Sequence, residues 1–232
     1  MADGSYHQFC PVAMASEVLG TRWTLVVLRE MVAGSSRFND IRRGVPRMSP
    51  ALLSKRLKEL EERGVVERVA APREPGVMEY RLTAAGEELA PIIVAVGEWG
   101  HRWTETKPQL EQLDVGLLMW DMRRNLKIAE LPARRVVIQF IYPERRHGER
   151  HWWIVVDPKD GADLCAVDPG FDVDLYIKTD LRTMTSIYMG VDAFSKAIDD
   201  DRLTLIGDKT LQRSLQRWLG LGMFSGVKKQ VP

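Results

Sequence analysis

A run of basic side chains between Arg37 and Lys58 is the feature of the sequence best suited to chemistry with a partner. Seven basic residues stand there against a single acid, Asp40, which gives the segment a net charge of +6. The whole chain carries 33 basic and 32 acidic residues and a net charge of only +1. Cations gathered on one segment of a neutral chain indicate a local surface that binds a polyanion. The seven are Arg37, Arg42, Arg43, Arg47, Lys55, Arg56 and Lys58.

A helix that starts at Ser49-Pro50 is predicted to carry the end of this segment. Serine is a favoured N-cap, and proline suits the first helical position because its missing N–H would be unpaired there in any case. Gly64 predicts where the helix ends. Leucines spaced by four and three residues predict one buried stripe. The stripe consists of Leu53, Leu57 and Leu60. The outer face consists of Ala51, Ser54, Lys55 and Lys58.

This outer face fits a helix that reads DNA. Such a helix must present small and hydrogen-bonding side chains to a major groove about 12 Å wide, with cations toward the flanking phosphates. Charge alone would fit a solvated surface equally well, so the position of the helix in the chain has to decide. Helical patterns at 12–19, 23–31 and 37–43 precede it, and strand-like runs at 65–69 and 79–82 follow it. This order predicts a winged helix-turn-helix, with Arg73 at the tip of the hairpin.

The first half of the chain is predicted to end in a helix from Thr83 towards Trp103. Its apolar residues are spaced by three or four, close to a heptad seam that needs a partner. In a two-fold dimer the same patch can pair with itself. The seam consists of Leu89, Ile92, Val96, Trp99 and Trp103.

Five motifs follow one another in a distinctive order: FCPV at 9–12, LGTRWT at 19–24, RFNDIRR at 37–43, SPALLSKRLKELE at 49–61 and LTAAG at 82–86. Together they resemble the HxlR-type family of bacterial transcriptional regulators over about residues 6–104. The resemblance implies a winged helix-turn-helix domain, a homodimer closed by terminal helices, and a double-stranded, pseudo-palindromic DNA operator. The expected DNA-binding residues are Arg37, Arg47, Ser49, Ala51, Ser54, Lys55, Lys58 and Arg73, and the seam is the expected dimer interface.

Cys10 offers a second kind of chemistry. Several members of the HxlR-type family sense oxidants or electrophiles through an N-terminal cysteine before a proline, and Cys10-Pro11 matches that position. A thiolate near a helix N-terminus can have a lowered pKa, which favours a redox role. A lone cysteine beside apolar residues such as Phe9 and Val12 is more often a packed hydrophobe. Cys165 lies 155 positions away, so the two cysteines form no metal or disulfide motif.

The residues after Pro108 are predicted to form a second domain, which divides the chain into 1–108 and 109–232. Helical patterns occupy 113–126, 181–188, 192–198 and 209–219, and strand patterns occupy 134–142, 152–157, 173–178 and 203–207. The fold class is therefore α+β, with one antiparallel sheet covered by helices in the second domain.

The tract 174–208 contains a strand, a helix with a glycine near its end, a second helix, and a strand that ends in Gly207-Asp208. This order is similar to the sterol carrier protein type 2-like fold, over about residues 113–225. The resemblance implies an apolar tunnel that holds a small hydrophobic effector. The alternative is that the same side chains fill a closed core. The expected effector-binding residues are Trp120, Phe140, Trp152, Ile154, Met184, Tyr188 and Met189.

Other classes of function find little support in the sequence. His147 and His151 have the spacing of a zinc motif, but the intervening glutamate is misplaced and the segment reads as a hairpin turn, so no metal is expected. Gly207-Asp208-Lys209-Thr210 lacks the upstream glycine of a phosphate loop. Spacing identifies no catalytic set, so neither an enzyme nor a cofactor is predicted. No apolar run approaches the roughly 20 residues of a membrane span, and no secretory signal is present, so a cytoplasmic location is expected, on the nucleoid when DNA is bound.

The sequence therefore predicts a homodimeric DNA-binding regulator, a repressor by family habit, whose second domain binds a small hydrophobic effector. Two alternatives remain open. In the first, Cys10 is the switch and the second domain is structural. In the second, the C-terminal domain is a lipid carrier or an enzyme, and the helix-turn-helix only tethers it to DNA.

Overall fold

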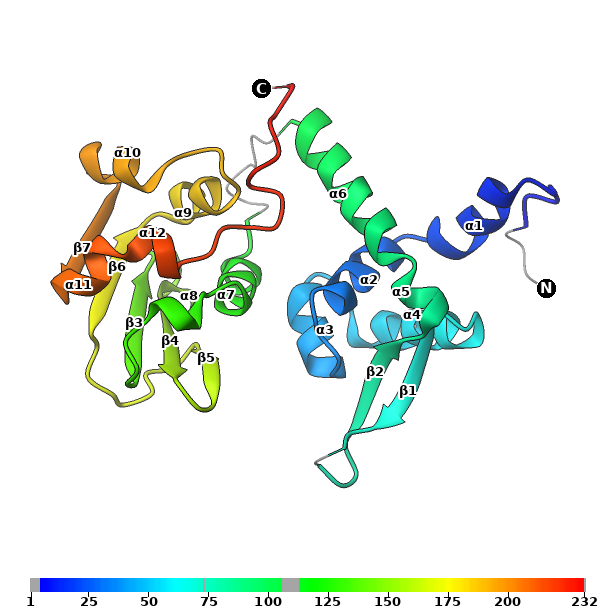
Figure 1. The fold of residues 1–232 in the computed structure, drawn as a ribbon, viewed down its shortest axis with the longest axis horizontal. Coiled ribbons are helices and arrows are strands. Elements are labelled where there is room, and N and C mark those ends of the chain that lie inside the picture. The colour runs from blue at the N-terminus through cyan, green and yellow to red at the C-terminus, as the bar shows by residue number, and fades with distance from the viewer. Residues whose placement is uncertain (1–4, 73, 106–112, 232) are drawn as a thin grey trace. The chain divides into compact units, whose positions relative to one another are not determined.

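The computed structural model of the protein describes residues 5–72, 74–105 and 113–231 (Figure 1). The chain divides into two compact units, Met1–Gly100 and His101–Pro232. Each unit has a hydrophobic core of its own. The division falls in the last turn of a helix, whereas the domain boundary predicted after Pro108 lies outside the described residues.

The N-terminal unit consists of helices and one two-stranded sheet (Figure 1). Its helices are α1 (Pro11–Leu19), α2 (Thr24–Val32), α3 (Phe38–Gly44), α4 (Pro50–Glu62), α5 (Ala84–Glu87) and α6 (Ala90–Trp103), and its strands are β1 (Val66–Ala70) and β2 (Met78–Leu82). The order of α2, α3, α4 and the hairpin is that of a winged helix-turn-helix. The helix predicted from Thr83 to Trp103 is thus two helices, with Thr83 as the N-cap of the first.

Helix α4 begins and ends where the sequence predicts. The Oγ atom of Ser49 accepts a hydrogen bond from the N–H of Leu52 at 3.2 Å, and Pro50 occupies the first turn. At the other end Gly64 has a φ of +69°, which glycine adopts without strain. The N–H of Val65 then donates to the carbonyl of Leu60 at 3.0 Å, as in a Schellman cap. The predicted stripe of Leu53, Leu57 and Leu60 is buried in the core of this unit.

The hairpin after α4 forms the wing. Strands β1 and β2 pair antiparallel, with Val66 opposite Leu82 and Ala70 opposite Met78. Figure 1 shows the hairpin extending away from the helices that it follows. Its base is fixed by Thr83, whose hydroxyl donates to the carbonyl of Gly64 at 2.6 Å. The wing is therefore anchored at the point where α4 ends.

The C-terminal unit is an α+β domain. Its strands are β3 (Val136–Ile141), β4 (His151–Asp157), β5 (Gly161–Cys165), β6 (Leu175–Thr179) and β7 (Leu203–Gly207). Its helices are α7 (Val115–Arg124), the 3-10 helix η2 (Ile128–Glu130), α8 (His147–Arg150), α9 (Leu181–Tyr188), α10 (Phe194–Asp199), α11 (Lys209–Arg213) and α12 (Leu215–Trp218).

The sheet of this unit is mixed, so the prediction of an antiparallel sheet was wrong in one respect. The strand order is β5-β4-β3-β6-β7, and β3 and β6 run parallel. Strand β5 was not predicted. It pairs with β4 and extends the β3–β4 hairpin into a three-stranded antiparallel meander. The chain then returns to the other edge of β3, where β6 lies. Asp174 fixes that return: its carboxylate accepts from the N–H of Val137 at 2.8 Å, and its own N–H donates to the carbonyl of Val137 at 2.9 Å.

One face of the sheet carries the core of the C-terminal unit. Alternate residues of β3 point into it, and they pack with side chains of α7, α9, α10, α11 and α12. The core residues of β3 and its end are Val136, Ile138, Phe140 and Tyr142, as the alternation predicts. The connection from β3 to β4 contains the single-turn helix α8, where the sequence suggested only a hairpin turn. Nothing lies within 4 Å of the missing Cβ of Gly148, so no close contact requires glycine at this position of the turn.

Candidate nucleic-acid interface

The outer face of α4 is open to solvent along its length. Ser49, Ala51, Ser54, Lys55 and Lys58 are all exposed, whereas the leucines of the opposite face are buried. Ser49 and Ala51 lie in the first turn, where the groove-reading residues of a recognition helix are found. Lys55 follows about one turn after Ala51, and Lys58 about two turns after it. The helix therefore presents small side chains first and cations behind them, as entry into a major groove requires.

The other predicted DNA-binding residues lie at three places. Arg47 is exposed in the turn between α3 and α4. Arg37 is the N-cap residue of α3, and its guanidinium is paired with Glu74 in the tip of the wing. This ion pair raises the pKa of Arg37 and ties the start of α3 to the wing. Arg73, predicted to reach DNA from that tip, lies outside the described residues.

Helix α6 exposes most of the predicted dimer seam. Ile92, Val96, Trp99 and Trp103 are exposed, and Trp99 retains 62% of its accessible surface. Leu89 differs, because it lies before α6 and packs against the core of the N-terminal unit. Ile93, about a quarter turn round the helix from this stripe, is buried and holds α6 to the same core. The exposed stripe is apolar surface of the kind that marks an interface.

Cys10 is the N-cap residue of α1, and its thiol side chain is half-buried. Phe9 beside it is 99% exposed, and Val12 and Met14 of α1 are exposed as well. These exposed neighbours therefore do not form the packed surroundings that we would expect if Cys10 were an ordinary buried hydrophobic residue. Cys165 lies at the end of β5, where burial raises the pKa of its thiol.

The predicted effector-binding residues are distributed through the interior of the C-terminal unit. Phe140, Ile154 and Met184 have no exposed surface, and Tyr188 packs in the same core cluster. The hydroxyl of Tyr188 donates to Asp121 at 3.1 Å and accepts from the amide of Asn125 at 2.6 Å.

The remaining effector-binding candidates lie near this core. Trp120 is buried and has the guanidinium of Arg123 over its ring, while Trp152 and Met189 are half-buried. As they stand, the fully buried side chains pack against one another. The apolar tunnel stays a prediction.

The part of the chain that the structure describes contains no group of three or more His, Cys, Asp or Glu side chains placed to hold a metal ion. His147 begins α8 and His151 begins β4. None of the described helices is long and apolar enough to cross a bilayer.

Three helices followed by a two-stranded wing, with a basic and small-residue face on the third, define a DNA-binding domain of the winged helix-turn-helix class. The family model described as HxlR-like helix-turn-helix matches residues 18–108. Two uncharacterised HTH-type transcriptional regulators of Bacillus subtilis (strain 168) are similar to this chain. YvaP is 38% identical over 99 residues, which are 42% of this chain and 92% of YvaP. YdeP is 32% identical over 102 residues, which are 44% of this chain and 80% of YdeP. The chain belongs to the HxlR-like helix-turn-helix family of transcriptional regulators.

Among solved structures, the reduced form of the transcriptional regulator YodB from Bacillus subtilis is similar at 31% sequence identity. It covers 42% of this chain and 97% of YodB, with a TM-score of 0.37. The family match and these relatives cover less than half of this chain. The sterol carrier protein type 2-like resemblance of the C-terminal unit stays a prediction, although the predicted order of β6, α9, α10 and β7 is present.

Two features near the interface were not predicted from the sequence. The first is the pairing of Arg37 with Glu74, which joins residues 37 positions apart and has no local signal. The second concerns Arg56, which was counted among the cations of the basic segment but is buried in the structure. Its spacing, three residues after Leu53 and four before Leu60, could have indicated this orientation.

Proposed function

We propose that the protein is a homodimeric, sequence-specific DNA-binding repressor whose helix α4 enters the major groove. The observation that carries the proposal is the outer face of α4, where every residue expected to contact DNA is exposed. Ser49 and Ala51 would contact base edges, and Lys55 and Lys58 would contact phosphates. The family resemblance favours repression over activation.

The dimer is the second part of the proposal. An operator with two half-sites requires two recognition helices about one helical turn, or ~34 Å, apart. The exposed apolar stripe of α6 supports a two-fold interface, because one such stripe can bury its twin in a second copy. Val96 and Trp99 lie near the middle of that stripe.

The hydrophobic effector of the C-terminal unit remains a proposal as well. Because Phe140, Ile154 and Met184 are fully buried, an effector would have to separate the helices from the sheet before it could enter. The competing switch is Cys10, which lies at the N-terminus of α1 with its side chain partly accessible. The response of Cys10 to an oxidant distinguishes a thiol switch from a switch operated by the C-terminal effector.

Selection from random double-stranded DNA with the purified full-length protein tests the proposed function. We expect enrichment of an inverted repeat whose half-site centres lie about 10 base pairs, or a multiple of that, apart. Binding that shows no sequence preference after repeated rounds would contradict the proposal, and enrichment of a single half-site would contradict the dimer.

A further inference from the structure

The ion pair between Arg37 and Glu74 joins two elements that are both expected at DNA. Arg37 is the N-cap residue of α3, and Glu74 lies in the turn that connects β1 to β2. Helix α3 is the first helix of the helix-turn-helix, which crosses the DNA backbone beside the groove that the recognition helix enters. An arginine that starts this helix and touches the wing tip is therefore expected close to the phosphates between the two elements.

Glu74 occupies the guanidinium of Arg37 in the protein without DNA. Among the described residues, Glu74 is the only side chain that hydrogen-bonds or ion-pairs with Arg37. Two other acids act on Arg37 from a distance, but Asp40 and Glu79 each pair with another arginine. A carboxylate oxygen thus takes the place on Arg37 that a phosphate oxygen would take in a complex with DNA, since both are acceptors for a guanidinium.

Both side chains of this pair are accessible enough to exchange partners. The side chain of Arg37 is 42% exposed and that of Glu74 is 49% exposed. Exposed ion pairs contribute little to stability, so a DNA phosphate can replace the carboxylate at small cost. The wing does not depend on the pair for its attachment, because the N–H of Tyr80 in β2 donates to the carbonyl of Ser36 at 2.7 Å.

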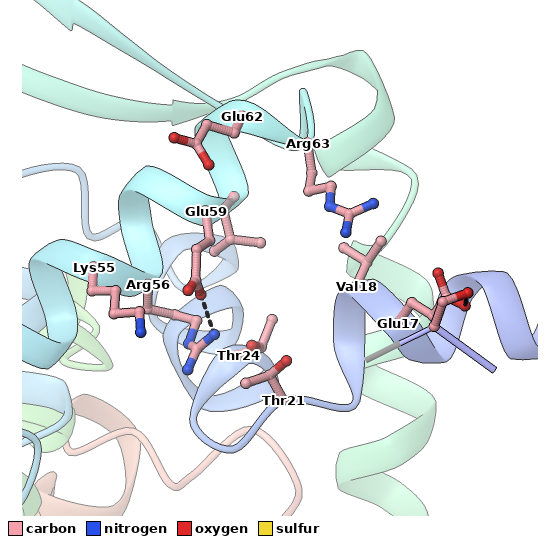
Figure 2. A pocket seen from close by; sticks show the side chains of 11 residues that line it. Glu17, Val18, Thr21, Thr24, Lys55, Arg56, Glu59, Glu62 and Arg63 are labelled. Carbon is pink, nitrogen blue, oxygen red and sulfur yellow. Dashed lines mark hydrogen bonds and ion pairs between the residues drawn. The ribbon is translucent and has the colours of Figure 1, made fainter. Parts of the chain in front are cut away.

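Arg56 of α4 is the opposite case. It lines a pocket of about 420 Å³ between α1, the start of α2 and α4, where it pairs with Glu59 (Figure 2). The side chain of Arg56 is only 11% exposed. A guanidinium held in this way cannot reach a phosphate unless it leaves its packed site, so the pairing of Arg56 with Glu59 is structural. The exposed pair at Arg37 has no such restraint.

We propose that Glu74 makes an autoinhibitory contact that lowers the affinity for DNA. In the free protein its carboxylate holds Arg37 in the place of a DNA phosphate, and Arg37 exchanges Glu74 for a phosphate when DNA binds. The released carboxylate then lies near a polyanion, which adds repulsion to the loss of the ion pair. The inference rests on the proposed function. Since phosphates carry no sequence information, Glu74 lowers the affinity for every duplex and leaves the preferred sequence unchanged.

The test compares the full-length wild type with Glu74→Gln by fluorescence anisotropy on a labelled DNA duplex of mixed sequence, so that no operator has to be known. We expect Glu74→Gln to bind about fivefold more tightly, the gain expected when one exposed ion pair no longer has to break. The slope of log affinity against log salt should also steepen by up to about one unit, because no released carboxylate takes up a cation. An equal affinity or an unaltered slope would overturn the proposal.

A second arm tests whether Glu74 acts through Arg37. Arg37→Gln should weaken binding, and Glu74→Gln added to it should have little further effect, since the pair is already absent. The matched control is Glu67→Gln, which removes an exposed negative charge from β1 of the same hairpin. If Glu74→Gln gains as much in the Arg37→Gln protein as in the wild type, or no more than Glu67→Gln gains, Glu74 acts only through its charge and the proposal is wrong.

Failure of this inference and failure of the proposed function give different results. A wild type that binds no duplex even at low salt would contradict the proposed function, and the inference with it. A wild type that binds duplex as tightly as Glu74→Gln would overturn the inference alone. Thermal melting followed by circular dichroism without DNA should be the same for the wild type and Glu74→Gln, because both partners of the pair are exposed.

Discussion

The buried carboxylate of Glu30 in α2 occupies the space that a Cβ atom on Gly44 in α3 would need. A Cβ built on Gly44 would lie 1.8 Å from Cδ of Glu30. Glu30 has no exposed surface and pairs with Arg29 at 2.8 Å. The same guanidinium donates to the carbonyl of Gly44 at 3.2 Å. Two helices of the helix-turn-helix are thus locked together around a charge that only glycine at position 44 accommodates.

Gly44→Ala should therefore destabilise the N-terminal unit. The new methyl group would displace a buried carboxylate from its partners, which adds loss of an ion pair to overpacking of about 1–3 kcal/mol. Urea unfolding followed by circular dichroism would measure the change. Gly100→Ala is the control, since it lies in α6 with nothing within 4 Å of its missing Cβ. That variant should be neutral or slightly more stable. Equal stability of Gly44→Ala and wild type would show that Glu30 can move aside.

Lys55→Ala and Lys58→Ala should weaken DNA binding without changing the preferred sequence. Each lysine is expected to neutralise one phosphate, so each loss should reduce the slope of log affinity against log salt by about one unit. Fluorescence anisotropy with the selected operator, at several salt concentrations, measures the slope. Lys159→Ala, in the exposed turn between β4 and β5, serves as the control. An unaltered slope in the α4 variants would mean that these lysines do not contact the DNA backbone.

Local signals predicted the parts of the fold that local physics determines. Ser49 caps α4, Gly64 follows its end, and the spacing of its leucines gave the buried face, because each depends on residues within a few positions. The alternation of β3 likewise indicated its core face. The family motifs also predicted DNA binding, which secondary-structure propensities alone could not indicate.

Interactions between distant residues escaped prediction. Strand β5 contains Asp163, which interrupts its apolar pattern, and the strand exists because β4 offers it an edge. The parallel pairing of β6 with β3 depends on Asp174 meeting Val137 across 37 positions. The pocket beside Arg56 has the same origin, since α1, α2 and α4 meet there only in the folded unit.

Trp99→Lys should dissociate the proposed dimer. The substitution places a charge in the middle of the exposed stripe of α6, where burial against a second copy would be costly. Sedimentation velocity would follow the shift from dimer to monomer, with circular dichroism to show that the unit stays folded. Val167→Lys, at an exposed apolar residue of the C-terminal unit, is the comparison. If both variants remain dimeric, the interface lies elsewhere; if neither the wild type nor the variants dimerise, the two-fold proposal fails.

Peroxide treatment of Cys10→Ser separates the two proposed switches. If the C-terminal effector is the switch, operator affinity should be the same for wild type and Cys10→Ser before and after hydrogen peroxide. A loss of affinity confined to proteins that retain Cys10 would instead identify the thiol as the sensor. Cys165→Ser controls for oxidation elsewhere, and the raised pKa of Cys165 predicts a slow reaction at that site, because the thiolate is the reactive form. Fluorescence anisotropy with labelled operator measures the operator affinity of wild type, Cys10→Ser and Cys165→Ser under the same conditions.

Phe140→Ala distinguishes a filled C-terminal core from an open tunnel. Phe140 has no exposed surface and packs among the side chains of the sheet and the helices. Its truncation in a closed core should cost about 3–5 kcal/mol in the free energy of unfolding, since a cavity replaces the ring. If Phe140 instead lined an open tunnel, the free energy of unfolding would fall much less, because the truncation would create no new void. Urea unfolding measures the difference, with Ile206→Ala at an exposed position of β7 as the control. A cost as small as that of the control would favour the tunnel, and with it the proposed hydrophobic effector; a large cost would leave the effector without a preformed site.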